Sequence, residues 1–171
     1  MNDLANELAF VTGASRGIGH AIALELGRRG ARVVGTATSE GGAQAISEAL
    51  VAAGVQGRGV VLDVANAAAV EACLKDVESH EGTPSILVNN AGVTRDGLLL
   101  RMSAEDWQVV IDTDLSAIYR TCKAVMRGMM KARRGRIINI ASVVGVMGNA
   151  GQANYAAAKA GMIGFSKSLA R

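Results

Sequence analysis

Short apolar runs alternate with longer amphipathic stretches along the whole chain. Runs rich in Val, Ile and Leu predict strands over residues 8–12, 31–36, 59–63, 85–89 and 136–141. Helical spacing of apolar residues predicts helices over residues 17–29, 43–53, 66–81, 104–132 and 154–170. Continuous apolar strands separated by helices are typical of a parallel sheet that is buried on both faces.

This alternation predicts an α/β fold. Because crossovers between parallel strands are right-handed, the expected architecture is a doubly wound, Rossmann-type parallel sheet in three α/β/α layers. The chain has no internal linker, repeat or low-complexity segment, so residues 1–171 are predicted to form one domain.

Composition and charge exclude several classes of function. The net charge of +3 is mild and the basic residues are spread along the chain, which gives no case for nucleic acid. Cys73 and Cys122 lack metal-ligand spacing, so we expect reduced core thiols and no metal site. We see no signal peptide and no apolar run long enough to span a bilayer. A soluble, cytoplasmic protein without membrane contact is therefore expected.

The polar and glycine-rich segments gather where the predicted strands end. In a doubly wound sheet, ligands bind at the carboxyl ends of the strands. The segments at these ends are 13–19, 36–38, Asp63, 89–92 and Ser142. Their shared position predicts one site at this edge of the sheet.

The first of these segments has the spacing Gly13-x-x-x-Gly17-x-Gly19 between a predicted strand and a predicted helix. Glycines let a backbone approach a pyrophosphate, whose charge is stabilised by the amides of a helix N-terminus. The predicted cofactor contacts in this segment are Gly13, Ser15, Arg16, Gly17, Ile18 and Gly19. The alternative is an ordinary glycine-rich turn. The domain is thus predicted to bind a dinucleotide.

The segment after the second strand indicates which dinucleotide the domain binds. An acidic residue that would bind a ribose 2′-hydroxyl is missing there, and the chain reads Gly35-Thr-Ala-Thr38-Ser39 instead. Arg16 and Thr38 are suited to hold a 2′-phosphate, which a carboxylate would repel. NADP(H) is therefore predicted, although Arg16 as a solvated loop residue is the alternative.

Two further strand ends are candidate cofactor contacts. Asp63 is placed to accept a hydrogen bond from the adenine amino group, with the Val64 amide beside it, or else to cap the following helix. Asn89-Asn90-Ala91-Gly92 contains small residues and turn formers. A plain turn would explain it, but its position favours backbone contact with the cofactor ribose.

Ser142, Tyr155 and Lys159 are the catalytic candidates. Tyr155 and Lys159 are four residues apart on a predicted helix, so both side chains face the same cleft. A tyrosine ionises near pH 10 in water, and Lys159 together with an oxidised nicotinamide would lower that value. Ser142 would bind the substrate carbonyl oxygen, where negative charge develops. An unrelated surface Tyr/Lys pair is the alternative.

The glycine loop, Asn-Asn-Ala-Gly and Ser…Tyr-x-x-x-Lys occur in the order that is typical of the short-chain dehydrogenase/reductases. The chain resembles this family from about residue 8 to residue 171. Residues 89–96 and 142–159 are most similar to the bacterial 3-oxoacyl-[acyl-carrier-protein] reductases of fatty-acid synthesis.

The resemblance implies NADPH-dependent reduction of a 3-oxoacyl thioester, carried on acyl carrier protein, by a homotetramer. It implies that Tyr155 protonates the carbonyl oxygen and that Lys159 binds the nicotinamide ribose. The alternatives are another short-chain reductase, such as an acetoacetyl-CoA reductase, and a truncated, catalytically inactive nucleotide-binding module.

The chain departs from the family pattern in two places. Thr113-Asp114-Leu115 stands where the family has Thr-Asn-Leu, so Asp114 takes the position of the fourth catalytic residue. A carboxylate beside Lys159 would offset its charge, and we expect slower turnover than in Asp114→Asn. Family members also continue for about another third of a subunit. A C-terminally truncated fold without the family's last strands is therefore expected, with the 136–141 strand as an exposed edge.

Overall fold

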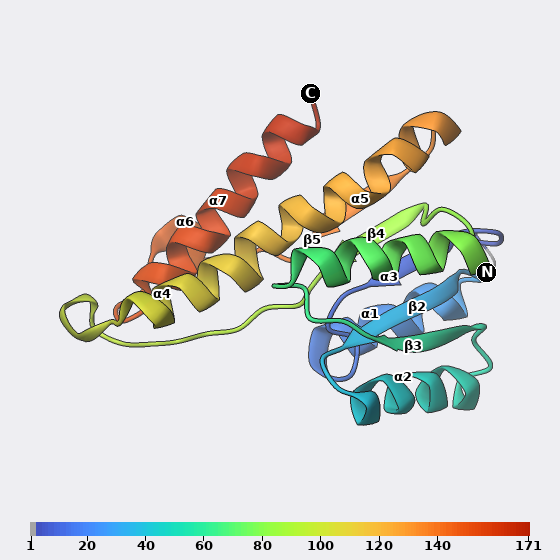
Figure 1. Cartoon of the computed structure of the whole chain (residues 1–171), viewed down its shortest axis with the longest axis horizontal. Helices are drawn as coiled ribbons and strands as arrows, with labels where there is room; N and C mark the ends of the chain where they lie inside the picture. Colours follow the sequence, from blue (N-terminus) through green and yellow to red (C-terminus); the bar gives the residue numbers. More distant parts are fainter. Residues whose placement is uncertain (1–2) are drawn as a thin grey trace.

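The computed structural model describes residues 3–171, and Figure 1 shows the arrangement of its elements. In these residues the sheet has five parallel strands. They are β1 (Leu8–Val11), β2 (Arg32–Ala37), β3 (Gly57–Val61), β4 (Ile86–Asn89) and β5 (Arg136–Asn139), in the order β3-β2-β1-β4-β5. The chain begins in the middle of the sheet and winds outward in both directions, so the prediction of a doubly wound sheet is confirmed.

Helices cover both faces of the sheet. They are α1 (Gly17–Arg28), α2 (Glu40–Ala52), α3 (Ala67–His80), α4 (Ala104–Ile111), α5 (Ala117–Ala132), α6 (Val144–Met147) and α7 (Ala153–Leu169), with a 3-10 turn, η1 (Leu99–Arg101), and a π-helical turn, η2 (Asp112–Ser116). Side chains of α1 and α2 pack on one face, and those of α3, α5 and α7 pack on the other. This arrangement confirms the predicted three layers.

The central strand β1 shows how the sequence divides the core. Leu8 and Phe10 belong to the apolar cluster beneath α3 and α5, whereas Ala9 and Val11 belong to the cluster beneath α1 and α2. Successive strand residues point to opposite faces, so an uninterrupted apolar run supplies both clusters.

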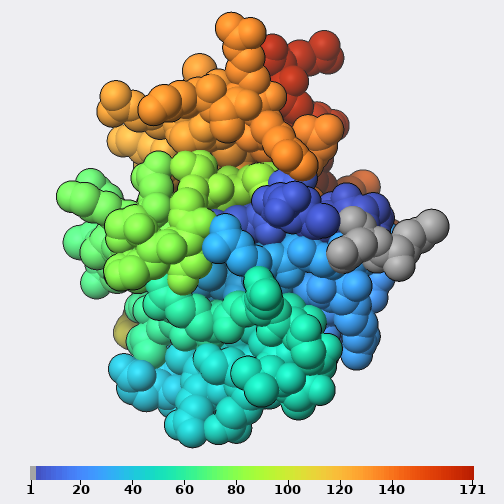
Figure 2. All heavy atoms as spheres, turned by 90° about the vertical axis from the view of Figure 1, so that its right-hand side faces the viewer, coloured from blue at the N-terminus to red at the C-terminus, as the bar shows by residue number. Residues whose placement is uncertain are grey.

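Early and late parts of the chain lie at opposite ends of the molecule. Figure 2 shows the region of α2 and β3 at one end, in cyan and teal, and α5 with the C-terminal residues at the other, in orange and red. This separation follows the strand order, in which β3 and β5 are the two edges. The central strands β1 and β4 join the two regions.

The predicted helix over 104–132 is interrupted in the structure. It consists of α4, the π-helical turn η2 and α5. A π-helical turn adds a residue to the helical repeat and is often found at functional sites. Here the wider turn contains Asp114, whose carboxylate lies buried and accepts a hydrogen bond from the Val93 amide at 2.8 Å.

Two of the other boundaries that differ from the prediction have causes that the structure shows. Helix α2 begins at Glu40 rather than 43, because the Ser39 side chain accepts a hydrogen bond from the Gly42 amide and caps the helix. Strand β3 covers Gly57–Val61 rather than 59–63. Gly57 pairs with Val33, and a side chain at Gly57 would lie 2.0 Å from the Val33 carbonyl oxygen.

Strand β5 is an edge of the sheet formed by residues 3–171, as expected. Its Ile137 packs against the core, while Ile138 is 44% exposed. The described part of the chain thus leaves apolar side-chain surface at this edge.

Candidate active site

The loops that follow the five strands lie at the same edge of the sheet, because all the strands are parallel. The loops after β1 and β4 are joined by a hydroxyl that sequence reasoning missed. Thr12 Oγ1 accepts hydrogen bonds from the amides of Asn90 and Ala91, each at 3.0 Å. The Asn90 side chain donates in return to the carbonyl oxygens of Thr12 (2.9 Å) and Gly13 (3.0 Å). The predicted glycine loop and the predicted Asn-Asn-Ala-Gly turn therefore form one structure.

Close packing explains Gly19 in this loop, and backbone conformation explains Gly13. A side chain at Gly19 would lie 2.3 Å from the Gly13 carbonyl oxygen and 2.4 Å from Asn90 Nδ2. Gly13 has a positive φ of 64°, and its amide donates to Thr36 Oγ1 at 3.2 Å. Thr36, which the sequence suggested only as part of a strand end, thus fixes the start of the loop.

The N-terminus of α1 has the features of an anion site. The helix begins after Arg16, has no side-chain cap and has no acidic residue in its first turn. Gly17 has a φ of 59°, and apart from its chain neighbours and its own helix backbone, no described residue comes within 4 Å of the position that its Cβ would take. Ser15, Arg16 and Ile18 are exposed around this opening. Free amides, open space and the helix dipole together fit a phosphate group.

Thr38 lies beyond the end of β2, in the exposed turn that leads to the cap of α2. No carboxylate occupies this turn until Glu40, the first residue of α2. Arg16 and Thr38 are both exposed and extend from loops at the same edge of the sheet.

The structure corrects the description of Asp63. Strand β3 ends at Val61, so Asp63 lies in the following loop instead of ending the strand. Its Oδ1 accepts a hydrogen bond from the Ala65 amide at 2.9 Å. The alternative prediction, a cap for the next helix, is also wrong, because Asn66 caps α3 through the Ala69 amide. Val64, beside Asp63, is buried.

Helix α7 presents Tyr155 and Lys159 one turn apart, with Lys159 Nζ 5.4 Å from the centre of the Tyr155 ring. Lys159 is 4% exposed, and Nζ donates to the Ile140 carbonyl oxygen at 3.0 Å. Ile140 and Ser142 belong to the loop after β5, so Lys159 fixes α7 against the segment that contains Ser142. Ser142 Oγ accepts a hydrogen bond from the Val144 amide at 3.2 Å.

The short helix α6 was absent from the sequence prediction, and glycine allows it to lie close to α7. A side chain at Gly145 would be 2.7 Å from the Lys159 carbonyl carbon and 2.8 Å from its Cβ. The available sequence signal for this turn was Ser142 itself, because serine side chains often bond to the backbone two residues on.

The π-helical turn brings Asp114 to the catalytic lysine. Asp114 Oδ2 lies 3.4 Å from Lys159 Nζ, and both side chains are nearly inaccessible to solvent. This contact is an ion pair without hydrogen-bond alignment, because Oδ2 has no hydrogen-bond partner among residues 3–171. Burial raises the pKa of Asp114, while the Val93 amide and the Lys159 charge act in the opposite direction. Gly92 provides the space, since a side chain there would lie 2.7 Å from Oδ2.

A hydrogen-bonded series of amides and hydroxyls supports the strand ends beneath this site, with Asn89 and Thr121 buried and Asn139 and Ser166 half-buried. Asn89 Nδ2 donates to Asn139 Oδ1 at 2.8 Å, and Thr121 Oγ1 donates to Asn89 Oδ1 at 2.7 Å. Asn139 Nδ2 in turn donates to Ser166 Oγ at 2.8 Å. Asn89 was predicted as the last residue of a strand and the start of a turn, and it is the buried last residue of β4. Asn89 at the end of one apolar run and Asn139 within the next were the sequence signal for these hydrogen bonds.

Asn154 was likewise missed. It is fully buried, and its Nδ2 donates to the carbonyl oxygens of Arg95 (2.9 Å) and Asp106 (3.3 Å). The residue before Tyr155 thus fastens the start of α7 to the loop after β4 and to α4. Gln152 adds hydrogen bonds of 3.1 and 3.0 Å to the Asp96 carboxylate.

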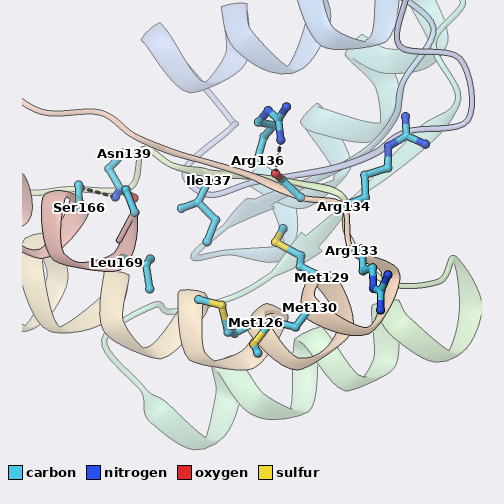
Figure 3. Close-up of a pocket in the computed structure, with 12 residues that line it drawn as sticks. Met126, Met129, Met130, Arg133, Arg134, Arg136, Ile137, Asn139, Ser166 and Leu169 are labelled. Atoms are coloured by element: carbon cyan, nitrogen blue, oxygen red, sulfur yellow. Dashed lines mark hydrogen bonds between the residues drawn. The ribbon is translucent and has the colours of Figure 1, made fainter.

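A cavity of about 580 Å³ lies away from these residues, between α5, β5 and α7. Figure 3 shows Met126, Met129 and Met130 on one side of it and Arg133, Arg134 and Arg136 around its end. Ser142, Tyr155 and Lys159 do not line it. The candidate active site is therefore the open edge where the loops meet, and not this cavity.

Residues 3–171 contain no cluster of His, Cys, Asp and Glu that would hold a metal ion. Over the same described range, no helix is both long and apolar enough to cross a membrane.

The fold and the loops at the strand ends define a class of protein that comparison with known families identifies. Residues 7–171 match the short chain dehydrogenase family, and the chain belongs to this family of oxidoreductases, which use a nicotinamide cofactor. The resemblance seen in the sequence is thereby confirmed.

The comparison with curated proteins shows which members of the family the chain is similar to. The chain is 62% identical to the 3-oxoacyl-[acyl-carrier-protein] reductase of Pseudomonas aeruginosa, over 98% of this chain and 68% of the relative. The Escherichia coli protein of the same name is 62% identical over 96% of this chain and 66% of its own length. That of Vibrio harveyi is 61% identical over 99% and 68%. The chain thus spans about two thirds of the length of these relatives.

Proposed function

We propose that this protein reduces the ketone of a 3-oxoacyl thioester, carried on acyl carrier protein, to the 3-hydroxyacyl form with NADPH. The observation that carries the proposal is the Tyr155–Lys159 pair on α7, fixed through Ile140 to the loop that contains Ser142. The 62% identity to 3-oxoacyl-[acyl-carrier-protein] reductases supports this choice of substrate.

The glycine loop is proposed to hold the cofactor pyrophosphate. Its free helix amides and the open space at Gly17 fit that group. Arg16 and Thr38 are proposed to bind the 2′-phosphate, since guanidinium–phosphate hydrogen bonds are charge-assisted and the β2–α2 turn lacks a repelling carboxylate before Glu40. Further proposed contacts are Gly13, Ser15, Ile18 and Gly19 to the phosphates, Asp63 and Val64 to the adenine, and Asn90, Ala91, Gly92, Tyr155 and Lys159 to the ribose and nicotinamide.

Bound NADPH would supply the hydride for the reaction. The phenol of Tyr155 donates the proton that the reduced carbonyl oxygen requires. The ammonium of Lys159, held by Ile140, stabilises the phenolate that remains. Ser142 Oγ orients the carbonyl oxygen and donates to it as negative charge accumulates.

One observation favours a second candidate, a nucleotide-binding module without turnover. The carboxylate of Asp114 lies 3.4 Å from Lys159 Nζ and opposes its charge. Such a module would bind NADPH as tightly as the enzyme but would leave the substrate unchanged. An acetoacetyl-CoA reductase differs from the first proposal only in the carrier of the acyl group.

The assembly and location of the protein are also proposals. Exposed apolar side chains on α5 and α7, among them Met130 (69% exposed) and Leu169 (37%), are suited to pairing between copies, and a homotetramer is proposed. The cytoplasm, where NADPH and acyl carrier protein meet, is the proposed location.

The test is oxidation of NADPH by the purified protein with acetoacetyl-CoA as surrogate substrate, beside Tyr155→Phe. We expect turnover that falls about 100- to 10,000-fold in the variant, because the general acid is lost. NADPH binding, followed by its fluorescence, should be retained in both. Binding without turnover in the unmodified protein would reject the reductase in favour of the inactive module. Comparing acyl carrier protein with coenzyme A as carrier then separates the two reductases.

A further inference from the structure

Asp114 is placed where its charge reaches the catalytic tyrosine through Lys159. One carboxylate oxygen is satisfied by the Val93 amide at 2.8 Å, and the other faces Lys159 Nζ at 3.4 Å without a hydrogen bond. A buried carboxylate oxygen without a hydrogen bond is costly, and either a proton on it or the neighbouring ammonium reduces that cost. Lys159 lies in turn over the Tyr155 ring.

The other charged groups near the π-helical turn are engaged elsewhere. On α5, Arg120 pairs with Asp112 at 3.4 Å. On α4, Asp106 bonds to the Ser103 hydroxyl at 2.6 Å, while Glu105 is exposed. In the loop after β4, Asp96 binds Gln152.

Two more groups complete the surroundings of Asp114. On α7, Tyr155 shares a face with Lys159. In the loop after β4, the guanidinium of Arg95 bonds to the Thr94 carbonyl oxygen at 3.0 Å. Among residues 3–171, Lys159 is the charged group that pairs with Asp114. The two residues therefore form an isolated pair.

We infer that Asp114 controls the acidity of Tyr155 through Lys159 and so makes the site respond to pH. With its proton, Asp114 is neutral, and the full charge of Lys159 acts on the Tyr155 phenol. Without its proton, the carboxylate offsets Lys159, and Tyr155 gives up its proton less readily. The pH response of turnover rests on the proposed reductase function, whereas the effect on Tyr155 does not.

The burial of Asp114 supports this inference, because burial shifts the pKa of the carboxyl group upward. The pKa of Asp114 is raised above its ordinary value of 3.8, so the neutral form persists to higher pH than in an exposed aspartate. Turnover by the unmodified protein should then approach that of Asp114→Asn at low pH, where Asp114 is protonated. It should fall behind as the pH rises through the pKa of Asp114.

The direct test is a titration of Tyr155 without cofactor or substrate. The chain has two tyrosines, so the Tyr119→Phe background leaves phenolate absorbance from Tyr155 alone. Adding Asp114→Asn should lower the titration midpoint of Tyr155 by about one pH unit, because a charge next to Lys159 is removed. Asp114→Ser, which is also neutral, replaces Asn if that variant does not fold.

Asp112→Asn is the matched control. It removes a carboxylate from the same turn, but this one pairs with Arg120 instead of Lys159. The Tyr155 midpoint should therefore stay where it is in the background protein. An equal shift in both variants would show a general charge effect and would overturn the inference, as would an unchanged midpoint in Asp114→Asn.

The second test is the pH profile of kcat with acetoacetyl-CoA. Asp114→Asn should exceed the unmodified protein by about three- to tenfold above the pKa of Asp114, and the ratio should approach one as the pH falls. Parallel profiles would overturn the pH response. Absence of turnover in every variant, with a shifted Tyr155 midpoint, would reject the proposed reductase and leave the control of Tyr155 by Asp114 standing.

Discussion

The two halves of this molecule build their parts of the site by different means. From β1 to β3, the loops are shaped by backbone conformation and by glycines, over a core of Ala, Val, Ile and Leu. The buried polar side chains of that half are the hydroxyls of Thr12 and Thr36. From β4 to α7, buried amides and charged groups are present as well, namely Asn89, Asp114, Asn154 and Lys159. A phosphate needs close approach of amides, whereas proton transfer needs side chains held at fixed positions. We therefore expect substitutions that add volume to destabilise the first half most. Substitutions that remove hydrogen bonds should destabilise the second half most.

Gly19→Ala is the strongest test of the first half. The new methyl group would lie 2.3 Å from the Gly13 carbonyl oxygen, so the loop between them must move. We expect a loss of about 3 kcal/mol in the free energy of unfolding and loss of NADPH binding. Urea denaturation and cofactor fluorescence measure the two effects. Gly41→Ala, in α2 with open space around it, is the control and should not destabilise the protein. If the two variants lose the same stability and the same NADPH binding, close packing at Gly19 does not shape the loop.

Asn89→Ala is the corresponding test of the second half. It removes the donor to the half-buried Asn139 amide oxygen and one acceptor of the Thr121 hydroxyl, which keeps the Ala117 carbonyl oxygen at 3.0 Å. A loss of about 2 kcal/mol in the free energy of unfolding is expected, because each unsatisfied buried group costs about 1–3 kcal/mol. Equilibrium denaturation checks this value. Asn149→Ala, at an exposed position, should change stability by less than about 0.5 kcal/mol. If Asn89→Ala lowers the free energy of unfolding as little as Asn149→Ala does, these hydrogen bonds contribute little to stability.

Arg16→Ala sharpens the comparison by removing a side chain from a site that is otherwise built from backbone. We expect the preference for NADPH over NADH to fall about tenfold, since a charge-assisted contact to the 2′-phosphate is lost. The ratio of the two cofactors' Kd values is the measurement. Arg28→Ala, at the other end of α1, should keep the ratio. If Arg16→Ala keeps the preference for NADPH over NADH, Arg16 does not bind the 2′-phosphate and is a solvated loop residue.

The smallest expected effect is a pH dependence of stability in the second half. Because burial raises the pKa of Asp114, the folded protein holds this proton more firmly than the unfolded chain. Relative to Asp114→Asn, the unmodified protein should lose stability as the pH rises from the ordinary value of 3.8 through the raised pKa, and no further loss should follow above it. Denaturation midpoints of both proteins across this range would show it. A difference that grows toward low pH has the opposite sign and would contradict the assignment.

The sequence predicted the features that depend on hydrophobic periodicity and on the positions where strands end. Apolar runs located all five strands of the described residues, because a parallel sheet buries both faces of each strand. The Tyr155–Lys159 pair followed from helical spacing alone. Features that depend on contacts between distant segments were not predictable. Thr12 gives no sign in the sequence that its hydroxyl binds the amides of a loop 78 residues away.

The same limit explains the boundary errors. The π-helical turn at 112–116 carries no periodicity signal that separates it from the helices around it. Strand β3 was placed two residues late, because its first residue is Gly57, whose fit against Val33 appears only in the folded sheet. Asp63 was misplaced as a consequence of that shift.

The Thr12 hydroxyl has a consequence for how the protein fluctuates. It accepts from two amides of the loop after β4, while the Asn90 side chain bonds to two carbonyl oxygens of the loop after β1. Neither loop can separate from the sheet edge without breaking bonds to the other. Amide hydrogens on both loops should therefore exchange with solvent through a shared opening event of one free energy. Entry of a long ligand would then require both loops to relax together, and its binding would slow exchange in both.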